Sequence, residues 1–482
     1  MMRLYRFLSL AALALLTLPA QAQDCTCAAS FELVVQNYES NYSLFNIKVT
    51  DENRELYKAY TDVFRSRASE VKEIENCLPV LTQWLQFFRD GHTGIKFTGT
   101  GSQAAKRERI ETDRKKFEAT YKKKGYRKND LPGIWQYGAY EVAIMPDPTA
   151  STQSKDYVGV ILSSANKLWK PGDIKFKLSH VYGNDYKAVV FMDDDSGKKL
   201  EGELRNPNEL EFKNFNRWAK SWPNSAPATA AKEQADLYSD FHIRMLDGKV
   251  PYVRFLNFYE KEPAFVDSLF KAHHDQLVQA DFIVVDVRDN DGGNDNVYFP
   301  ALPYILSGPI QIPQAGMWMS EGNLETALEG VDPETLNEAD RAEYDFLMAQ
   351  KNSIFWYGND DYARTYTPKT VFAPHQKVAV LMNGKTASSG ETFVYRAMQS
   401  DKVVLYGQNT AGVVDGFTVF TKRIGCFELR YPSSLRAKDI ADNPVDPYGF
   451  APDVYISPDA DALEFSIRHM RQLLENQAKP AP

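Results

Sequence analysis

Three short apolar runs in the second half of the sequence constrain the fold of this chain most strongly. They cover residues 282–287, 378–382 and 403–406, and nearly every position in them is apolar. Strands of this kind are typical of a parallel sheet that is buried on both faces. A helical pattern at residues 391–398 separates the last two runs, as a crossover connection between parallel strands requires. The sequence therefore predicts an α/β core over residues 240–475.

The rest of the 482-residue chain divides into two further regions. Residues 23–130 have helical patterns, and their charged stretch at 104–130 interleaves acids with lysines and arginines, so we interpret it as a solvated helix face. Residues 131–220 change to short alternating runs separated by Asn, Asp and Gly turns, which predicts a small all-β module. We expect Trp135 and Trp169 to anchor its core.

Residues 1–22 have the features of a secretory signal peptide. Arg3 and Arg6 precede an apolar run at 7–18, and Ala20 and Ala22 fit a small-residue cleavage site. We expect export to the periplasm or the extracellular space, with cleavage near Ala22. No later apolar run is long enough for a transmembrane segment. The net charge of −8 argues against nucleic acid as a general partner.

The four cysteines, Cys25, Cys27, Cys77 and Cys426, all follow the predicted leader. An even number in an exported chain usually means disulfides. Cys25 and Cys27 are too close to pair comfortably with each other, so we expect one of them to join Cys77. A metal site is disfavoured, because the spacing is not Cys-x2-Cys and no histidine pair follows. We expect neither a metal nor another cofactor.

The sequence Thr-Ala-Ser-Ser-Gly-Glu at 386–391 is the most informative motif. It follows the apolar run at 378–382 and the turn residues Asn383-Gly384, and it precedes a helical pattern. A serine at such a turn lies where helix amides and the helix dipole favour a developing negative charge. A serine hydroxyl is a poor nucleophile without a base, so the motif requires a base elsewhere in the chain.

His92 is the best candidate for that base. It lies in Asp90-Gly91-His92-Thr93, after a helical pattern and before a short strand-like run, where a side chain can reach out from a rigid support. His242, at the start of a strand, is a weaker candidate. The remaining histidines occupy ordinary positions in the β module, on helices or in a loop; they are His180, His273, His274, His375 and His469.

A pair of glycines, Gly292 and Gly293, follows the apolar run at 282–287 in Asn-Asp-Gly-Gly. Glycines at the C-terminal end of a strand let backbone amides approach a ligand closely. Ligands on open α/β sheets bind at this end of the strands. The alternative interpretation is a plain Gly-Gly turn.

In this order, the motifs resemble the serine protease family of the C-terminal-processing (tail-specific) proteases and the tricorn core protease. The resemblance covers about residues 241–460 and the N-terminal segment up to His92, and it includes Gly407 to Gly412 and Gly449 to Val454. It implies a crotonase-like (ClpP/crotonase) α/β core. It also implies an exported serine endopeptidase that cleaves a peptide or protein substrate through an acyl-enzyme.

The resemblance implies a role for individual residues. The family's nucleophile precedes an acid by three positions, which places it at Ser388 with Glu391 as the acid; Ser389 is the runner-up. The processing proteases use a lysine after a Gly-x-x-Thr-x-Gly segment, but Val413 follows that segment here. The chain is therefore closer to the tricorn-like branch, in which a histidine, here His92, is the base.

The same branch has an acid shortly before its Gly-x-x-Pro-Asp segment. Asp446 fits that position best, Asp442 is a rival, and Glu391 is expected to assist. The oxyanion donors would be the backbone amides of Gly292 or Gly293 and of Ser389.

The β module is a departure from the family. Many relatives carry a PDZ domain in that position, but residues 131–220 have no Gly-Leu-Gly-Phe-like loop. A retinoid-carrying relative indicates an alternative function, a non-catalytic carrier of apolar ligands on the same fold. The combination of Ser388, His92 and Asp446 favours the enzyme.

Overall fold

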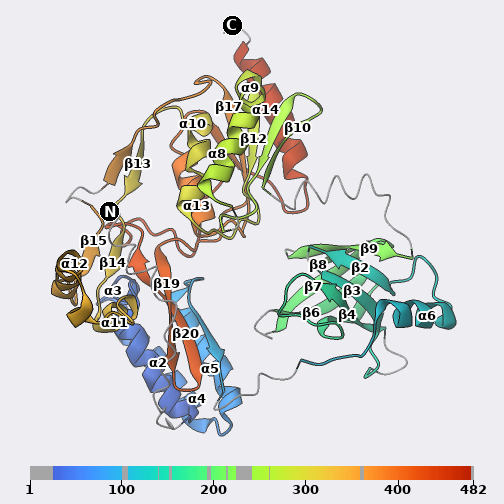
Figure 1. The fold of residues 1–482 in the computed structure, drawn as a ribbon, viewed down its shortest axis with the longest axis horizontal. Coiled ribbons are helices and arrows are strands. Elements are labelled where there is room, and N and C mark those ends of the chain that lie inside the picture. The colour runs from blue at the N-terminus through green and yellow to red at the C-terminus, as the bar shows by residue number, and fades with distance from the viewer. Residues whose placement is uncertain are drawn as a thin grey trace. The chain divides into compact units, whose positions relative to one another are not determined.

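The computed structural model describes residues 25–99, 107–138, 140–150, 155–192, 197–212, 215–223, 241–259, 261–358 and 363–478. The predicted signal peptide lies outside these residues. The chain forms two compact units (Figure 1). The first comprises Met1–Ser102 and Asp240–Pro482, and the second is Gln103–Ser239. No helix among the described residues has the length and apolar composition needed to cross a bilayer.

A six-stranded sheet forms the centre of the first unit and confirms the predicted α/β core. Its order is β10-β11-β12-β17-β18-β21, antiparallel at the β10 edge and parallel elsewhere. All five residues of β12 are buried, which explains its unbroken apolar sequence. The strands are β10 (His242–Leu246), β11 (Val250–Arg254), β12 (Phe282–Asp286), β17 (Lys377–Met382), β18 (Val403–Gly407) and β21 (Val454–Tyr455).

Helices cover this sheet, as the parallel crossovers require. Side chains of α8 and α13 enter the same hydrophobic core as the central strands, and α14 packs against β17 and β18. The helices are α8 (Pro263–Ala272), α9 (His274–Gln279), α13 (Ser389–Ala397) and α14 (Ala462–Ala478).

A second sheet in this unit joins segments that are far apart in sequence. Its path is β1-β20-β14-β15, and β19 pairs with β20. The β1–β20 pairing brings the strand after His92 beside residues 427–430. The strands are β1 (Gly94–Phe97), β14 (Gly316–Trp318), β15 (Ile354–Trp356), β19 (Gly416–Ile424) and β20 (Phe427–Leu435).

The N-terminal helices share one hydrophobic core with this second sheet. Its aromatic side chains include Phe31, Tyr38, Trp84 and Phe88, all fully buried. The elements are α2 (Cys27–Asn41), α3 (Phe45–Lys48), α4 (Arg54–Glu70), η1 (Ile74–Cys77), α5 (Leu78–Leu85) and η2 (Gln86–Phe88).

The long segment between β12 and β17 adds mostly short elements at the edge of the unit. Strands β13 and β16 pair with each other, outside both larger sheets. The elements are η3 (Asp295–Val297), η4 (Phe299–Ala301), α10 (Leu302–Ile305), β13 (Ile310–Pro313), α11 (Glu321–Ala327), η5 (Pro333–Thr335), α12 (Glu338–Ala349) and β16 (Ala363–Tyr366).

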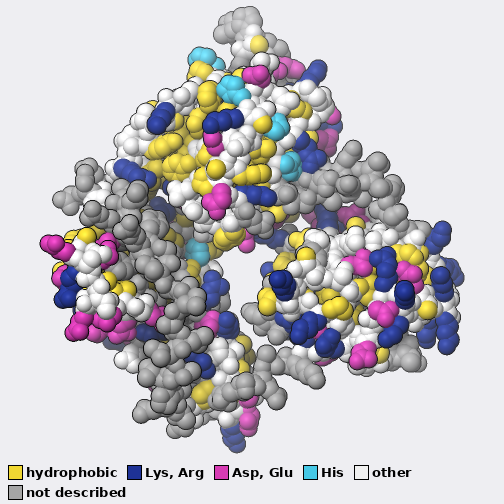
Figure 2. Space-filling model, viewed as in Figure 1, with side chains coloured by type: hydrophobic (Ala, Val, Ile, Leu, Met, Phe, Trp, Pro, Cys, Tyr) yellow, Lys and Arg dark blue, Asp and Glu magenta, His cyan; other side chains and the backbone are white. Residues whose placement is uncertain are grey.

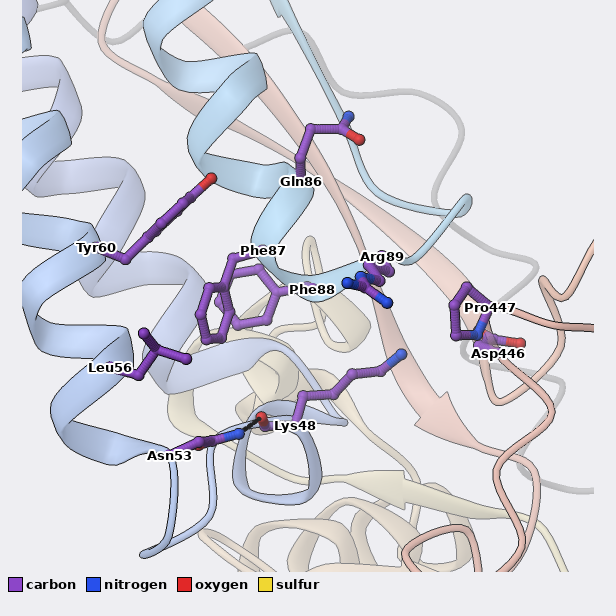
Figure 3. Close-up of a pocket in the computed structure, with 10 residues that line it drawn as sticks. All are labelled: Lys48, Asn53, Leu56, Tyr60, Gln86, Phe87, Phe88, Arg89, Asp446 and Pro447. Atoms are coloured by element: carbon purple, nitrogen blue, oxygen red, sulfur yellow. Dashed lines mark hydrogen bonds between the residues drawn. The ribbon is translucent and has the colours of Figure 1, made fainter.

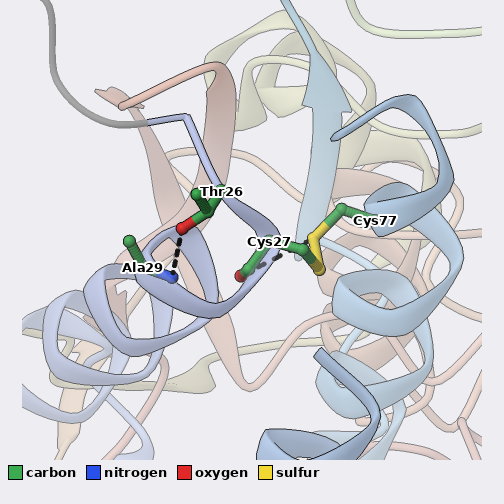
Figure 4. Close-up of a disulfide and its surroundings, with 4 residues drawn as sticks. All are labelled: Thr26, Cys27, Ala29 and Cys77. Atoms are coloured by element: carbon green, nitrogen blue, oxygen red, sulfur yellow. Dashed lines mark hydrogen bonds between the residues drawn. A yellow bond between two sulfur atoms is a disulfide. The ribbon is translucent and has the colours of Figure 1, made fainter. Parts of the chain in front are cut away.

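Two disulfides fasten the N-terminal helices. Cys27 pairs with Cys77, as expected for one of the two N-terminal cysteines, and joins the start of α2 to η1 (Figure 4). The second bond joins Cys25 to Cys426, in the turn between β19 and β20, across 401 residues. The helices are therefore covalently tied to each other and to the second sheet.

The second unit contains a closed eight-stranded barrel. Each strand from β2 to β9 pairs with the next, and β9 pairs with β2. Buried aromatic side chains fill its core, among them Trp135, Phe176, Phe212 and Trp218. The strands are β2 (Gly133–Tyr137), β3 (Tyr140–Pro146), β4 (Asp156–Ser164), β5 (Ile174–Tyr182), β6 (Asp185–Phe191), β7 (Gly197–Asn206), β8 (Glu209–Phe212) and β9 (Asn216–Trp222).

Helix α6 (Arg114–Lys124) accounts for part of the charged stretch before the barrel. Phe117 and Tyr121 are buried, while Arg114 lies 3.1 Å from Glu118 and 3.0 Å from Glu141. Basic and acidic side chains are interspersed over the face of this unit that Figure 2 shows. This agrees with a solvated helix face.

A buried ion pair lies at the C-terminal end of β12. Asp286 accepts hydrogen bonds from Arg254 at 2.9 Å, from Arg288 at 2.6 Å and from the Tyr252 hydroxyl at 2.7 Å. Arg254 and Asp286 are at most 1% exposed. Burial alone would raise the pKa of Asp286, but Arg288 and Arg254 hold it well below its usual range. The buried charge of Asp286 is therefore compensated only while both arginines are present.

We predict that Arg254→Met lowers the free energy of unfolding of this unit by about 3 kcal/mol, because it leaves a buried carboxylate with one cation fewer. Arg341→Met is the matched control, since Arg341 makes an exposed ion pair with Asp345 at 3.0 Å. It should change stability by less than about 0.5 kcal/mol. Urea unfolding followed by circular dichroism measures both, and equal effects would contradict the prediction.

Candidate active site

Ser388 lies at the turn between β17 and α13, as the serine motif predicts. Its φ of 53° and ψ of −119° form a conformation that residues with a side chain rarely adopt. Such strain persists only where the surroundings enforce it. Here Ala387 N donates to Asn290 O at 2.8 Å, and Ser388 N donates to Val413 O at 3.0 Å. The turn therefore presents a partly exposed hydroxyl at the N-terminus of α13.

Glu391 lies in the first turn of α13 and is completely buried. It accepts hydrogen bonds from Thr410 Oγ1 at 2.6 Å, Gly412 N at 2.8 Å and Val413 N at 2.7 Å, and a longer one from Ser388 N at 3.3 Å. Burial raises its pKa, and these donors oppose the rise. Both carboxylate oxygens are thus used to hold backbone in place.

Of the two glycines predicted for the site, Gly292 lies directly against Ser388, and Gly293 contacts Ser389. At Gly292, where φ is 107°, an added Cβ would come within 2.7 Å of Ser388 Cβ and 3.0 Å of Ser389 N. The Gly292 amide donates to Asn290 Oδ1 at 3.0 Å, so it is already engaged. Ser389 Oγ donates to Gly293 O at 2.8 Å and is likewise engaged.

Two backbone amides beside Ser388 remain available to a ligand. Neither Gly293 N nor Ser389 N donates to a residue in the part of the chain that the structure describes. Gly293 follows the glycine packed on Ser388, and Ser389 begins α13, where the first amides lack helical partners.

His92 is held in its turn by the side chain of Asp90. Asp90 Oδ1 accepts from His92 N at 2.9 Å, and its Oδ2 accepts from the Tyr42 hydroxyl at 2.7 Å. The intervening Gly91 packs on Val413, because an added Cβ would lie 2.6 Å from Val413 Cγ2. The histidine turn thus rests on the same residue whose carbonyl accepts from Ser388.

The imidazole of His92 is partly buried, and its Nδ1 has no hydrogen-bond partner among the described residues. Burial lowers its pKa, while the charge of Asp90 and the backbone of Gly416 work in the opposite direction. The ring is therefore neutral near pH 7 and able to accept a proton.

Most other histidines make structural contacts through a ring nitrogen. The ring of His242, the weaker candidate, lies 3.0 Å from Arg244 Nε. The remaining contacts are those of His180 with Gly183 O, His273 with Leu269 O, His274 with the Tyr304 hydroxyl, and His469 with the Tyr406 hydroxyl.

Asp446 is 4% exposed, whereas its rival Asp442 lies on the surface. Its Oδ1 accepts from Val414 N at 2.7 Å and from Asp415 N at 3.2 Å. Its Oδ2 is buried and has no partner among the described residues. Burial, followed by the charges of Asp415 and Asp90, raises the pKa of Asp446 to about 8.

Residues 410–416, here called the connecting segment, link these side chains. The segment contacts Glu391 through Thr410, Gly412 and Val413, the histidine turn through Val413, and Asp446 through the amides of Val414 and Asp415. A single stretch of backbone thus runs from the serine turn past the histidine turn to the buried acid.

Two acids at the site were not singled out by the sequence analysis. Asp90 was noted only as part of the histidine motif, although an aspartate two residues before a turn residue is a known backbone cap. Asp415 is fully buried, lies 2.9 Å from Arg436 Nε and accepts from Asp446 N at 3.0 Å. No pattern in the sequence marks Asp415, because its partners come from elsewhere in the chain.

The arrangement provides a hydroxyl, a neutral imidazole, a buried acid and two available amides. Among the described residues, no group of three or more His, Cys, Asp or Glu side chains could hold a metal ion. The chemistry that these parts support is nucleophilic attack by Ser388 with proton transfer to a histidine.

A comparison with family models matches part of the chain to a family of peptidases. The family model described as peptidase family S41 matches residues 249–456. A comparison with curated protein sequences finds no match.

Solved structures of several peptidases resemble the chain at low identity. Mature CPAF has 11% identity and a TM-score of 0.46, covering 95% of this chain and 99% of that chain. The photosystem II D1 C-terminal processing protease has 11% identity and a TM-score of 0.37, covering 90% and 94%. The tricorn protease has 12% identity and a TM-score of 0.41, covering 93% and 37%.

We predict that the strained backbone of Ser388 has a measurable effect on the free energy of unfolding. Ser388→Gly should unfold with a free energy about 1 kcal/mol higher than Ser388→Ala, because glycine adopts positive φ without steric cost. Ser389→Gly compared with Ser389→Ala should have the opposite sign, since Ser389 begins the regular helix. Urea unfolding measures both pairs. If the difference in unfolding free energy between the glycine and the alanine variant had the same sign at both positions, the strained conformation of Ser388 would be contradicted.

Proposed function

We propose that the chain, whose residues 249–456 match the model of peptidase family S41, is an exported serine endopeptidase that acts through an acyl-enzyme on Ser388. The observation that carries the proposal is the strained backbone of Ser388, whose own amide donates to Val413 O of the connecting segment, while the next amide, that of Ser389, has no acceptor among the described residues. The substrate is a peptide or protein.

In the acylation step, the Ser388 hydroxyl attacks the carbonyl carbon of the scissile peptide bond while the His92 imidazole takes its proton. The lowered pKa of His92 supports this role, because the ring is neutral and ready to accept. The imidazolium then returns the proton to the leaving amine. Water, activated by the same histidine, releases the acyl group from Ser388.

The oxyanion formed in each step carries a negative charge that needs donors already in position. We assign this role to the amide of Ser389, which follows Ser388, and to that of Gly293, whose carbonyl accepts from Ser389 Oγ. The Gly292 amide contributes indirectly, since its bond to Asn290 Oδ1 shapes the loop. Ser389 then contributes its backbone amide and is not the nucleophile, because its hydroxyl donates a hydrogen bond to Gly293 O.

Asp446 is proposed as the acid that orients His92 and stabilises the imidazolium. Two buried atoms without partners support this assignment, Nδ1 of His92 and Oδ2 of Asp446. A hydrogen bond between them would satisfy both, and an orphaned polar atom in a buried site calls for such an explanation. Glu391 is assigned a positioning role, because it holds the connecting segment.

A histidine base places the enzyme in the tricorn-like branch, as Val413 in the lysine position also indicates. Export after cleavage near Ala22 is supported by the two disulfides, which form in oxidising compartments. The carrier alternative would need space inside the β module for an apolar ligand. The barrel core instead holds Phe176 packed edge to face against Phe212 and Trp218.

We predict that a fluorophosphonate serine probe labels the wild-type protein and Ser389→Ala but not Ser388→Ala, since only Ser388 is the nucleophile. Intact-mass spectrometry measures the adduct. His92→Ala should reduce labelling and turnover by on the order of 10³-fold or more. Lys422→Ala is the control, because the Lys422 ammonium pairs with Glu325 at 3.8 Å. Labelling that persists in Ser388→Ala would reject the assignment.

We predict that kcat/KM rises with pH toward a midpoint near 8, because Asp446, whose pKa is raised to about 8, must lose its proton to stabilise the imidazolium. The free energy of unfolding should change in the opposite direction. Between about pH 4 and 8 the Asp446 carboxyl keeps its proton in the folded protein but loses it in the unfolded chain, so the free energy of unfolding falls as the pH rises through this range. Initial rates and urea unfolding from pH 5 to 9 measure both.

Asp446→Asn should lose the midpoint near 8 and flatten the fall in stability, whereas Asp442→Asn should keep both, since Asp442 is exposed. A wild-type profile that is flat from pH 7 to 9, or a midpoint that survives in Asp446→Asn, would assign the titration to another group.

A further inference from the structure

A pocket of about 470 Å³ opens beside Asp446, on the side formed by the N-terminal helices (Figure 3). This volume is in the range of small-molecule sites. The pocket belongs entirely to the first unit, and the catalytic assignments above leave it without a role. Its lining residues come from α3, α4, η2 and the segment before Gly449; they are Lys48, Asn53, Leu56, Tyr60, Gln86, Phe87, Phe88, Arg89, Asp446 and Pro447.

Two cations converge on this pocket. Both residues line the pocket, and Figure 3 shows the Lys48 side chain extending toward Arg89. Neither forms an ion pair with any carboxylate in the described part of the chain. Arg89 is held in the left-handed region, with φ of 46°, at the end of η2. Two positive charges that line the same pocket repel each other, and a bound anion would offset this repulsion.

The remaining wall of the pocket is largely apolar. Leu56 is 66% exposed on the surface of α4, and the ring of Phe87 is half-buried beside it. Tyr60 adds a third apolar surface, with its hydroxyl donating to Gln83 O at 2.7 Å. A polar ion such as sulfate would leave this wall in contact with water. The complementary ligand therefore has both a negative group and an apolar body.

Asp446 does not neutralise the cations at neutral pH. It lies near enough to Lys48 for their charges to interact, although the two form no ion pair. Because its pKa is raised to about 8, it holds its proton at pH 7. The pocket then presents two positive charges and a neutral acid to an incoming anion.

We propose that this pocket binds an organic carboxylate with an apolar body, held by Lys48 and Arg89 and packed on Leu56 and Phe87, and that the bound anion inhibits the peptidase through Asp446. The inhibitory part rests on the proposed function, in which Asp446 must ionise. A negative charge bound beside it disfavours that ionisation. The inhibitor would thus act by opposing the ionisation of Asp446 and would not compete with the substrate.

Binding is tested on the full-length Ser388→Ala protein, so that catalysis plays no part. Isothermal titration at pH 7 with 4-phenylbutyrate should give saturable binding, weakened at least 10-fold in a Lys48→Gln/Arg89→Gln variant. Lys58→Gln is the matched control, because Lys58 lies exposed on α4, 2.7 Å from Glu55. The uncharged 4-phenylbutyramide should bind at least 10-fold more weakly than the acid.

Equal binding of the acid and the amide, or undiminished binding by the double variant, would overturn the site. The same titration with a short peptide ending in phenylalanine, with a free or an amidated C-terminus, identifies the source of the carboxylate. A free-ended peptide that binds more tightly than 4-phenylbutyrate assigns the site to peptide ends, and the reverse assigns it to small organic acids; either supports a carboxylate site.

Inhibition is tested separately on the active enzyme. Saturating 4-phenylbutyrate should move the midpoint of the pH–rate profile upward by about half a unit or more, and the double variant should lose this shift. Binding without a shift would overturn the inhibitory part alone. If Ser388 is not the nucleophile, the labelling experiment fails while the titration still succeeds, so the two failures are distinguishable.

Discussion

The buried carboxylate of Glu391 is the interaction on which the rest of the site depends. It accepts from the serine turn on one side and from Thr410, Gly412 and Val413 on the other. A carboxylate costs free energy to bury, and the donors around Glu391 offset part of this cost. The backbone that it captures then carries the contacts with the histidine turn and with Asp446. One side chain in the first turn of α13 thus fixes the spacing of segments about 300 residues apart.

The N-terminal helices complete this arrangement from outside the sheet. Tyr42 binds Asp90, which caps the turn of His92, and the following strand β1 pairs with β20. The bond between Cys25 and Cys426 fastens the same helices to the β19–β20 turn. The turn of His92 must hold the imidazole at a fixed position relative to a serine that is distant in sequence. A turn supported by helices and a disulfide does this more accurately than a free loop. The helical region is accordingly part of the proposed catalytic unit.

The sequence predicted the features that depend on local pattern. Strand β12 was found within a residue of its expected end, because burial on both faces leaves an unbroken apolar run. Ser388 was found at the expected turn, because a strand, turn residues and a helical pattern follow one another directly. The Cys27–Cys77 bond was within the expected choices. Features that depend on distant partners were not predicted: the Cys25–Cys426 bond, the closure of the barrel by β2 and β9, and the contacts of Asp415. Each joins groups whose proximity exists only after folding.

The order of these parts along the chain has a consequence for the timing of synthesis. The ribosome makes the histidine turn first, then the barrel, then the sheet and the serine turn, and only afterwards the connecting segment and Asp446. The proposed site therefore cannot assemble until most of the chain has been made. A growing chain would already carry its histidine turn and the barrel strands while still lacking the connecting segment and Asp446. Dividing the site between both ends of the sequence makes completion of the polypeptide the first control on its activity.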